Sequence, residues 1–377
     1  MILELSEEHK EYQRTVRDEM NQIITENMAK SIDDEQRVPL EIFSKLAEKN
    51  FLNSIIPLEY GGLDHDYIKI GILNEEVGKT CSSIRSLLTV HGMVSQAIHN
   101  WGNSKQKNKW LPELANGEKI AAFALTEPKA GSNVNEIETE AIILENKSEL
   151  MLTGVKNWIT FGQIADVFLV FVMLNGEPTA LLVERETEGL EIEPIKNMIG
   201  TRGSMLAKLM FNQCKVSKEN ILGPIGAGLR YIVPNCLDFG RYTVAWGCIG
   251  IGESCLSDSL LYSKKRMQFK KPIYEHQLIK KMLTEMAVEI NAAKLLCYQA
   301  GYLLDMKDPS SIMATWHAKY ASSKMARKAS DYGVQIHGAN GCNGENRVER
   351  FFRDAKIMEI IEGSNQIHEI IIADSLY

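Results

Sequence analysis

Hydrophobic and polar positions divide the chain into three parts. The first and last have the spacing of helices, and the middle part has the spacing of strands. From residue 6 to about 118, apolar residues recur at the three- and four-residue spacing of amphipathic helices. One such stretch, Glu41–Asn50, follows Pro39, a residue that favours the first turn of a helix. Another, His91–Gly102, ends at a glycine suited to close a helix. We therefore expect helices throughout this first part.

The pattern changes near residue 119 and changes back after Pro234. Between about 119 and 222, short apolar or alternating runs are separated by Gly, Asn and Pro turns, which predicts six to eight antiparallel strands. After Pro234 long amphipathic stretches return and predict three or four long helices. The expected fold class is α+β, with an N-terminal helical domain (1–118), a central antiparallel β-domain (119–225) and a C-terminal four-helix bundle (226–377).

Composition fits a folded protein with long helices. The 377 residues are 45% hydrophobic and 24% charged, which excludes a disordered chain or a small disulfide scaffold. Only 10 prolines occur, which favours long helices. The net charge of −7 argues against a nucleic-acid partner. The eight histidines lack the spacing of metal ligands, so no metal site is expected.

No segment carries a membrane or export signal. The longest strongly apolar run, Val167–Leu174, is far shorter than the ~20 residues that span a bilayer. The N-terminus is charged from residue 4 on and lacks the apolar core of a signal peptide. Seven scattered cysteines form no CxxC pair, which is typical of reduced thiols. We expect a cytoplasmic protein without a membrane partner.

Two glycine-rich segments resemble nucleotide loops only superficially. Gly250–Gly252 lies inside a helical pattern with no preceding strand, and its small residues favour close helix packing instead. Gly223–Gly228 lacks the Lys-Ser/Thr of a phosphate loop. Neither predicts a dinucleotide or nucleoside triphosphate site.

Three other segments carry a specific signal: Phe123–Ser132, Lys156–Thr160 and Arg353–Ile367. In order and spacing they resemble the signature segments of the acyl-CoA dehydrogenase family of flavoproteins, and the resemblance extends over residues 5 to 374. Further matching segments are Arg241–Val244, Arg266–Phe269, Glu275–Gln277 and Gln335–Gly338. The resemblance implies a helical–β–helical fold, bound FAD, a homotetramer or homodimer, and an electron acceptor such as an electron-transfer flavoprotein.

Oxidation of an acyl thioester to its 2-enoyl product needs a base at Cα and a hydride acceptor at Cβ. Flavin N5 accepts hydride, and the base must have a pKa near the working pH. Glu362 follows two isoleucines, whose apolar surroundings raise a carboxyl pKa, and precedes Gly363, which permits a tight turn. On the sequence alone this pattern favours a surface glutamate before a helix over a catalytic base. The resemblance assigns the base to Glu362, and Gly240 stands where some relatives carry it instead.

The resemblance also assigns substrate and cofactor contacts. It places Ser132, Asp238 and Arg241 at the substrate, although an interhelical salt bridge also explains the Asp238 and Arg241 pair. The implied FAD contacts are Phe123, Leu125, Thr126, Gly131, Ser132, Trp158, Ile159, Thr160, Arg266, Phe269, His276, Gln277, Gln335, Gly338, Ala339, Ser364 and Gln366. Those from Arg266 to Gln277 are expected to reach partly into a neighbouring subunit.

The chain departs from the family pattern in the Met173–Thr179 hairpin. This hairpin is longer in members that use coenzyme A, whereas here it is reduced to a tight Asn-Gly turn. A shorter hairpin suggests that the acyl group arrives on an acyl carrier protein, and Cys81–His91 resembles carrier-dependent dehydrogenases of polyketide extender-unit biosynthesis. The basic run Lys264–Lys271 could meet an acidic carrier. Both carriers, coenzyme A and carrier protein, stay open at this point.

Two other functions remain as alternatives. One is a flavin oxidase or monooxygenase on the same scaffold, although such relatives often lack the glutamate base. The other is a flavin-free binding protein, against which the intact FAD segments argue. Smaller departures are Phe161, Ile361 and Ala339, which replace residues of other types common in the family.

Overall fold

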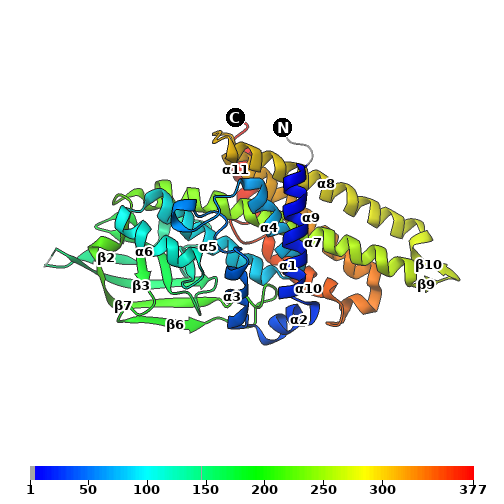
Figure 1. Cartoon of the computed structure of the whole chain (residues 1–377), viewed down its shortest axis with the longest axis horizontal. Coiled ribbons are helices and arrows are strands. Elements are labelled where there is room, and N and C mark those ends of the chain that lie inside the picture. The colour runs from blue at the N-terminus through cyan, green and yellow to red at the C-terminus, as the bar shows by residue number, and fades with distance from the viewer. Residues whose placement is uncertain (1–4, 146) are drawn as a thin grey trace.

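The computed structural model describes residues 5–145 and 147–377 and contains two helical regions on either side of a sheet in the sequence (Figure 1). The helices of the first region contain apolar stripes that face the core, and most begin at a side-chain cap such as Ser6, Thr25 or Asp66. Their bounds are α1 (Glu7–Ile23), α2 (Glu26–Glu35), α3 (Leu40–Glu48), α4 (Tyr67–Thr80), α5 (Ser82–Trp101) and α6 (Ser104–Ala115).

The middle region forms one sheet with the strand order β6-β7-β3-β2-β4-β5-β8, and β1 pairs with β4 beside this path. All pairs are antiparallel except β1–β4 and β2–β4. The strands are β1 (Ala121–Ala124), β2 (Glu140–Ile143), β3 (Glu149–Ile159), β4 (Val167–Leu174), β5 (Glu177–Glu184), β6 (Leu190–Pro194), β7 (Ala207–Ser217) and β8 (Ile221–Leu222).

Strand β4 is the longest apolar run of the sequence because both of its faces are buried. Leu169 and Phe171 belong to a core shared with the long helices, whereas Phe168, Val170 and Val172 belong to a second core shared with α1–α3. Because the side chains of a strand alternate between its two faces, burial on both faces requires a continuous apolar run. This strand therefore joins the two cores of the molecule.

The last region contains three long helices, followed by two short ones. Helix α7 packs against α4, α5, α8 and α9, so the first and last helical regions form a common layer (Figure 1). A short hairpin of β9 (Met267–Gln268) and β10 (Lys271–Pro272) joins α7 to α8. The helices are α7 (Val233–Lys265), α8 (Gln277–Asp305), α9 (Ser311–His337), α10 (Arg347–Met358) and α11 (Asn365–Asp374).

Glycines let α4 and α7 approach closely. A Cβ at Gly78 would lie 2.8 Å from the Gly247 carbonyl oxygen, and one at Gly250 would lie 2.3 Å from the Glu75 carbonyl oxygen. At Gly71 the Trp246 ring occupies the space of a side chain. The small residues around Gly250 therefore serve helix packing, as the sequence predicts.

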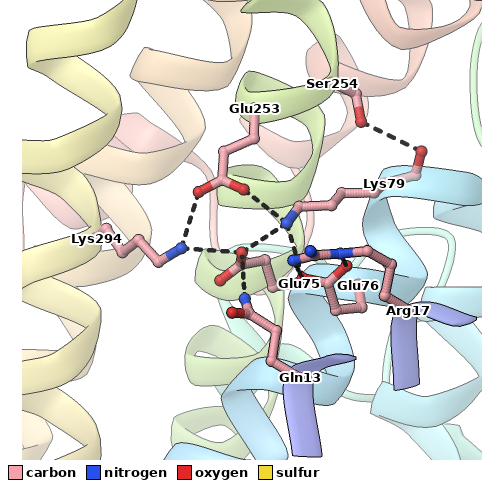
Figure 2. A network of polar contacts seen from close by, with 8 residues as sticks. All are labelled: Gln13, Arg17, Glu75, Glu76, Lys79, Glu253, Ser254 and Lys294. Atoms are coloured by element: carbon pink, nitrogen blue, oxygen red, sulfur yellow. Dashed lines mark hydrogen bonds and ion pairs between the residues drawn. The ribbon is translucent and has the colours of Figure 1, made fainter. Parts of the chain in front are cut away.

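A network of buried charges joins α1, α4, α7 and α8 (Figure 2). Lys79 lies 2.6–2.8 Å from three carboxylates, and Lys294 lies 2.8–2.9 Å from two of them. Burial raises the pKa of Glu75, whereas the two lysines lower that of Glu253 against the effect of its burial. The network contains three cations and three carboxylates, so its formal charge is balanced: Arg17, Lys79, Lys294, Glu75, Glu76 and Glu253.

Among the described residues, no helix is long and apolar enough to cross a membrane. The same residues contain no group of three His, Cys, Asp or Glu side chains placed to hold a metal ion.

Replacing Lys79 with methionine should destabilise the protein by about 3–5 kcal/mol, because it leaves buried carboxylates without their shared cation. Denaturant unfolding measures this change. The control Lys105→Met removes an exposed pair with Glu219 and should change stability by less than about 1 kcal/mol. Equal effects of the two substitutions would contradict a structural role for the network.

Candidate active site

Glu362 lies in the turn between α10 and α11, where the chain takes an unusual backbone conformation. Its φ is +54° and that of Gly363 is +89°, so two successive residues are left-handed. Left-handed conformations are strained for residues with a side chain and persist where surrounding contacts hold them. The residue keeps some contact with solvent, but its Oε2 is buried and has no hydrogen-bond partner among the described residues.

The Glu362 carboxylate points at α7 and lies over Gly240. A Cβ at Gly240 would come within 2.2 Å of Oε2, so a side chain at this position would displace the carboxylate. Burial raises the pKa of Glu362 to about 7, although the charges of Arg241, Arg85 and Lys319 oppose this shift. A carboxylate with this pKa can both accept and hold a proton near neutral pH.

Lys319 holds the turn from helix α9. Its Nζ donates hydrogen bonds to the Gly363 carbonyl oxygen at 2.7 Å and to Asn365 Oδ1 at 3.3 Å, and Ser323 also donates to Asn365. The lysine is fully buried, and burial lowers its pKa to about 8. Sequence reasoning missed Lys319, because a lysine in an amphipathic helix is typical of a solvated face.

Asp238 and Arg241 lie one helical turn apart on α7. Arg241 Nη1 is 2.6 Å from Asp238 Oδ1, and the guanidinium lies 3.8 Å from the centre of the Trp316 ring. The sequence suggested a salt bridge between helices for this pair, whereas the structure shows an ion pair within α7. It also lies beside the candidate base, since the charges of Arg241 and Glu362 influence each other.

The segments Phe123–Ser132 and Lys156–Thr160 lie side by side where β1 and β3 end. The Asn157 N–H donates to the Thr126 carbonyl oxygen at 2.8 Å. Buried Lys156 donates to the Leu125 carbonyl oxygen at 3.0 Å and to Glu127 Oε1 at 2.6 Å. The Glu127 carboxylate also accepts hydrogen bonds from two backbone N–H groups of the following loop. The buried ion pair therefore fixes the loop against β3.

The surface formed by these two segments suits a flat aromatic ring. Trp158 is 50% exposed at a φ of +61°, an unusual exposure for an indole next to a buried isoleucine. Phe123 and Thr126 are half-buried, Ser132 is exposed, and a Cβ at Gly131 would meet nothing within 4 Å. An open polar loop beside an exposed indole fits the isoalloxazine ring of FAD, so the residues present are compatible with this cofactor.

The remaining predicted FAD residues lie in two further places. Ser364 and Gln366 follow Glu362 directly, and Ser364 caps α11. Gln335, Gly338 and Ala339 lie exposed at the end of α9. The third group lies in or next to the β9–β10 hairpin, at the end of the helical layer far from the sheet (Figure 1): Arg266, Phe269, His276 and Gln277. Phe269 is 87% exposed there. Within one chain, the structure does not bring this third group to Glu362 and Trp158.

A cavity of about 460 Å³ opens between α1, α4, α7 and α10, and none of the predicted site residues lines it. Charged side chains around it belong to ion pairs such as Arg17 with Glu76 and Arg347 with Asp258. It therefore gives no candidate for the reaction centre.

Models of three domains match almost the whole chain. The acyl-CoA dehydrogenase N-terminal domain matches residues 6–118, the middle domain 122–214 and the C-terminal domain 226–377. The chain is 36% identical to acryloyl-CoA reductase (NADH) of Anaerotignum propionicum over 93% of this chain and 90% of that protein.

Three solved structures are similar over nearly their full lengths. Butyryl-CoA dehydrogenase from Megasphaera elsdenii has a TM-score of 0.95 at 30% identity and covers 100% of both chains. The prolyl acyl carrier protein oxidase AnaB has a TM-score of 0.93 at 26% identity, covering 99% of this chain and 100% of that one. FkbI, described for biosynthesis of the methoxymalonyl extender unit of the polyketide FK520, has a TM-score of 0.88 at 27% identity, covering 97% and 98%.

The predicted fold class and cofactor are thereby confirmed: the fold is that of the acyl-CoA dehydrogenases and the cofactor is FAD. The resemblance to carrier-dependent dehydrogenases also has counterparts among solved structures.

Replacing Lys156 with methionine should weaken FAD binding about tenfold or more, since a hydrogen bond to a charged group contributes about 1.5–3 kcal/mol. The expected readout is a lower ratio of flavin to protein absorbance after dialysis. Lys129→Met is the matched control, because Lys129 pairs with Glu138 at the exposed surface near the same loop. Full FAD retention by Lys156→Met would contradict the role given to the buried pair.

Proposed function

This chain belongs to the acyl-CoA dehydrogenase family of FAD-dependent oxidoreductases, and on that premise we propose that Glu362 is the base that removes the α-proton of an acyl thioester. Bound FAD supplies the acceptor for the hydride that leaves Cβ. The observation that carries the proposal is the enclosed Glu362 carboxylate, whose Oε2 lacks a partner and whose pKa is raised to about 7. No other described residue combines these properties with a left-handed turn.

The chain offers donors for the thioester carbonyl at the same turn. The backbone N–H groups of Glu362 and Gly363 donate no hydrogen bond to any described residue. A free N–H beside the base can stabilise the negative charge that develops on the carbonyl oxygen when the α-proton leaves. Lys319 then acts as a positioning residue, because it fixes the carbonyl side of the turn that presents both the base and these donors.

The other predicted residues take roles that follow from their places. Two segments would hold the flavin ring between them: one with Trp158, Ile159 and Thr160, the other with Phe123, Leu125, Thr126, Gly131 and Ser132. We further propose that Arg266, Phe269, His276 and Gln277 serve the cofactor of a neighbouring subunit in a homotetramer or homodimer. Their place at an exposed tip supports this arrangement, because they have no contact with Glu362 or Trp158 of their own chain.

We propose that the acyl group is carried on an acyl carrier protein. Strands β4 and β5 are joined by only Asn175 and Gly176, both left-handed, so the hairpin has the tight turn expected from the sequence. The likeness to AnaB and FkbI supports the same carrier. Coenzyme A is the second candidate, favoured by the higher identity to acryloyl-CoA reductase. We further propose an electron-transfer flavoprotein as the electron acceptor, which a solved neighbour described with such a protein supports, and the cytoplasm as the compartment.

The rate of flavin reduction by substrate should rise about tenfold between pH 6 and pH 8, because only ionised Glu362 can accept the α-proton. Anaerobic stopped-flow measurement of flavin bleaching tests this dependence. Glu362→Gln should keep the flavin and lower the bleaching rate by about a thousandfold or more. Glu359→Gln, which removes an exposed pair with Lys356, is the control and should keep the wild-type profile. A wild-type rate in Glu362→Gln would overturn the assignment of the base.

The carrier is tested by anaerobic bleaching with the same acyl group on coenzyme A and on an acyl carrier protein. We expect kcat/KM to be about tenfold or more higher on the carrier protein, since the short hairpin leaves less surface for the nucleotide end. Faster bleaching by the coenzyme A thioester would favour the second candidate. Rapid reoxidation of the reduced flavin by O₂ would favour an oxidase instead, and a colourless protein that binds no FAD would favour a binding protein.

A further inference from the structure

His368 is a buried histidine that no part of the proposed mechanism uses. It lies on α11, shortly after Glu362, and its side chain is fully buried. Its Nδ1 lies 3.0 Å from the Ser364 carbonyl oxygen, which can only accept a hydrogen bond, so Nδ1 carries the proton. Nε2 then keeps a free lone pair and has no hydrogen-bond partner among the described residues. Burial lowers the pKa of His368 to about 3, so the ring is uncharged at neutral pH.

The imidazole ring packs against the turn that carries the candidate base. A Cβ at Gly363 would lie 3.2 Å from His368 Cε1, so the ring lies against the backbone of this left-handed residue. The centre of the Trp316 ring, on α9, lies 4.6 Å from the centre of the His368 ring and 3.8 Å from the Arg241 guanidinium. Trp316 therefore contacts both the histidine of α11 and the arginine of α7. These contacts fix the ring that covers Gly363.

His368 and Lys319 hold two successive carbonyl groups of the turn. Lys319 donates to the Gly363 carbonyl oxygen at 2.7 Å, and His368 donates to the carbonyl oxygen of Ser364. The two donors come from different helices, α9 and α11, so side chains of both helices fix the backbone that follows Glu362. Two left-handed residues in succession are strained and persist only where the surrounding structure holds them. The contacts of His368 are therefore part of what keeps the turn in this conformation.

The donor on α11 is uncharged, which matters for the base. The charged groups around Glu362 come from three helices: Arg85 on α5, Asp238 and Arg241 on α7, and Lys319 on α9. The three cations all lower the pKa of Glu362, and only burial raises it. A lysine or arginine in place of His368 would add a fourth cation. A neutral imidazole supplies an N–H donor and a rigid ring without that charge.

We propose that His368 is a positioning residue for the reaction. Its Nδ1–H and its ring, which packs on Trp316, hold the Gly363–Ser364 backbone. The Glu362 carboxylate then stays enclosed over Gly240. Because its side chain is fully buried, His368 acts through the turn and not on the substrate. The inference rests on the proposed function, because it concerns the residue that positions the proposed base.

The test measures anaerobic flavin bleaching in the full-length holoenzyme as a function of pH, with the best of a series of saturated acyl thioesters, from propionyl to octanoyl, on either carrier. In wild type the rate should rise with a midpoint near pH 7, the pKa of Glu362. Without the ring of His368, water reaches the carboxylate and its pKa falls toward the ordinary value. His368→Ala should therefore lower the midpoint by about one pH unit or more. It should also lower the maximal rate about tenfold or more, since a misplacement of about 1 Å can cost about 100-fold, whereas the ratio of flavin to protein should not change.

Two milder variants separate the hydrogen bond of His368 from the packing of its ring. His368→Asn keeps a neutral N–H donor in the place of Nδ1 and removes the ring, whereas His368→Phe keeps an aromatic ring and removes the donor. Each should have a midpoint and a maximal rate between those of wild type and His368→Ala. Trp316→Leu should shift the midpoint in the same direction. His317→Ala is the matched control, because His317 is exposed on the same helix as Trp316, and should keep the wild-type profile.

A wild-type midpoint in His368→Ala would overturn the inference whatever the effect on rate or stability, because a merely structural histidine leaves the titration of Glu362 unchanged. The proposed function would then stand. If His368→Ala does not fold, the two milder variants decide: wild-type midpoints in both His368→Asn and His368→Phe overturn the inference, and lowered midpoints support it. If no thioester of the series bleaches the wild-type flavin, the proposed function fails and the inference fails with it.

Discussion

The hydrogen bond from Lys319 to the Gly363 carbonyl oxygen holds the turn on which the candidate site depends. Two left-handed residues in succession would not persist without such a contact. Because the turn is fixed, the Glu362 carboxylate can be enclosed against Gly240 without a hydrogen-bond donor of its own. An enclosed and unpartnered carboxylate is destabilising in its ionised form, and this is the property that a base at neutral pH requires. The strain of the turn and the raised pKa therefore have one structural origin.

Close packing between α4 and α7 decides which side chains can face that turn. Glycines at the contact bring the two backbones together, and the same helix α7 then presents Gly240, Arg241 and Thr243 toward the interior. Helix α5, which also packs against α7, contributes Arg85 and Thr89 to this region. Side chains from distant parts of the sequence thus meet because three buried helices share one contact surface.

Two groups of buried charges beside α7 differ in their hydrogen-bond partners. The network around Lys79 contains equal numbers of cations and carboxylates, which is typical of a structural role (Figure 2). Around Glu362, by contrast, Arg85 and Lys319 donate hydrogen bonds only to neutral groups.

Periodicity and composition predicted the order of helices, strands and helices, since apolar spacing reports directly which face of each element is buried. The signature segments predicted the family and FAD, because such segments keep residue types that a bound ring and its phosphates require. For Asp238 and Arg241 the sequence suggested an interhelical salt bridge as the alternative to a substrate contact, whereas the ion pair lies within α7. The sequence did not predict the two parallel strand pairs or the separation of the Arg266–Gln277 group from Glu362. Pairing partners and distances within one chain depend on contacts between residues that are distant in the sequence.

The sequence by itself determined the fold class, the cofactor and the residue type at the candidate base. Tertiary structure alone decided that Glu362 is enclosed over Gly240, that Lys319 holds its turn, and that buried Arg85 donates only to neutral groups. The physical reason is that a local pattern fixes which side of an element is buried. Burial of a charge, and the presence or absence of its partner, depends on residues brought together from α5, α7, α9 and the turn before α11.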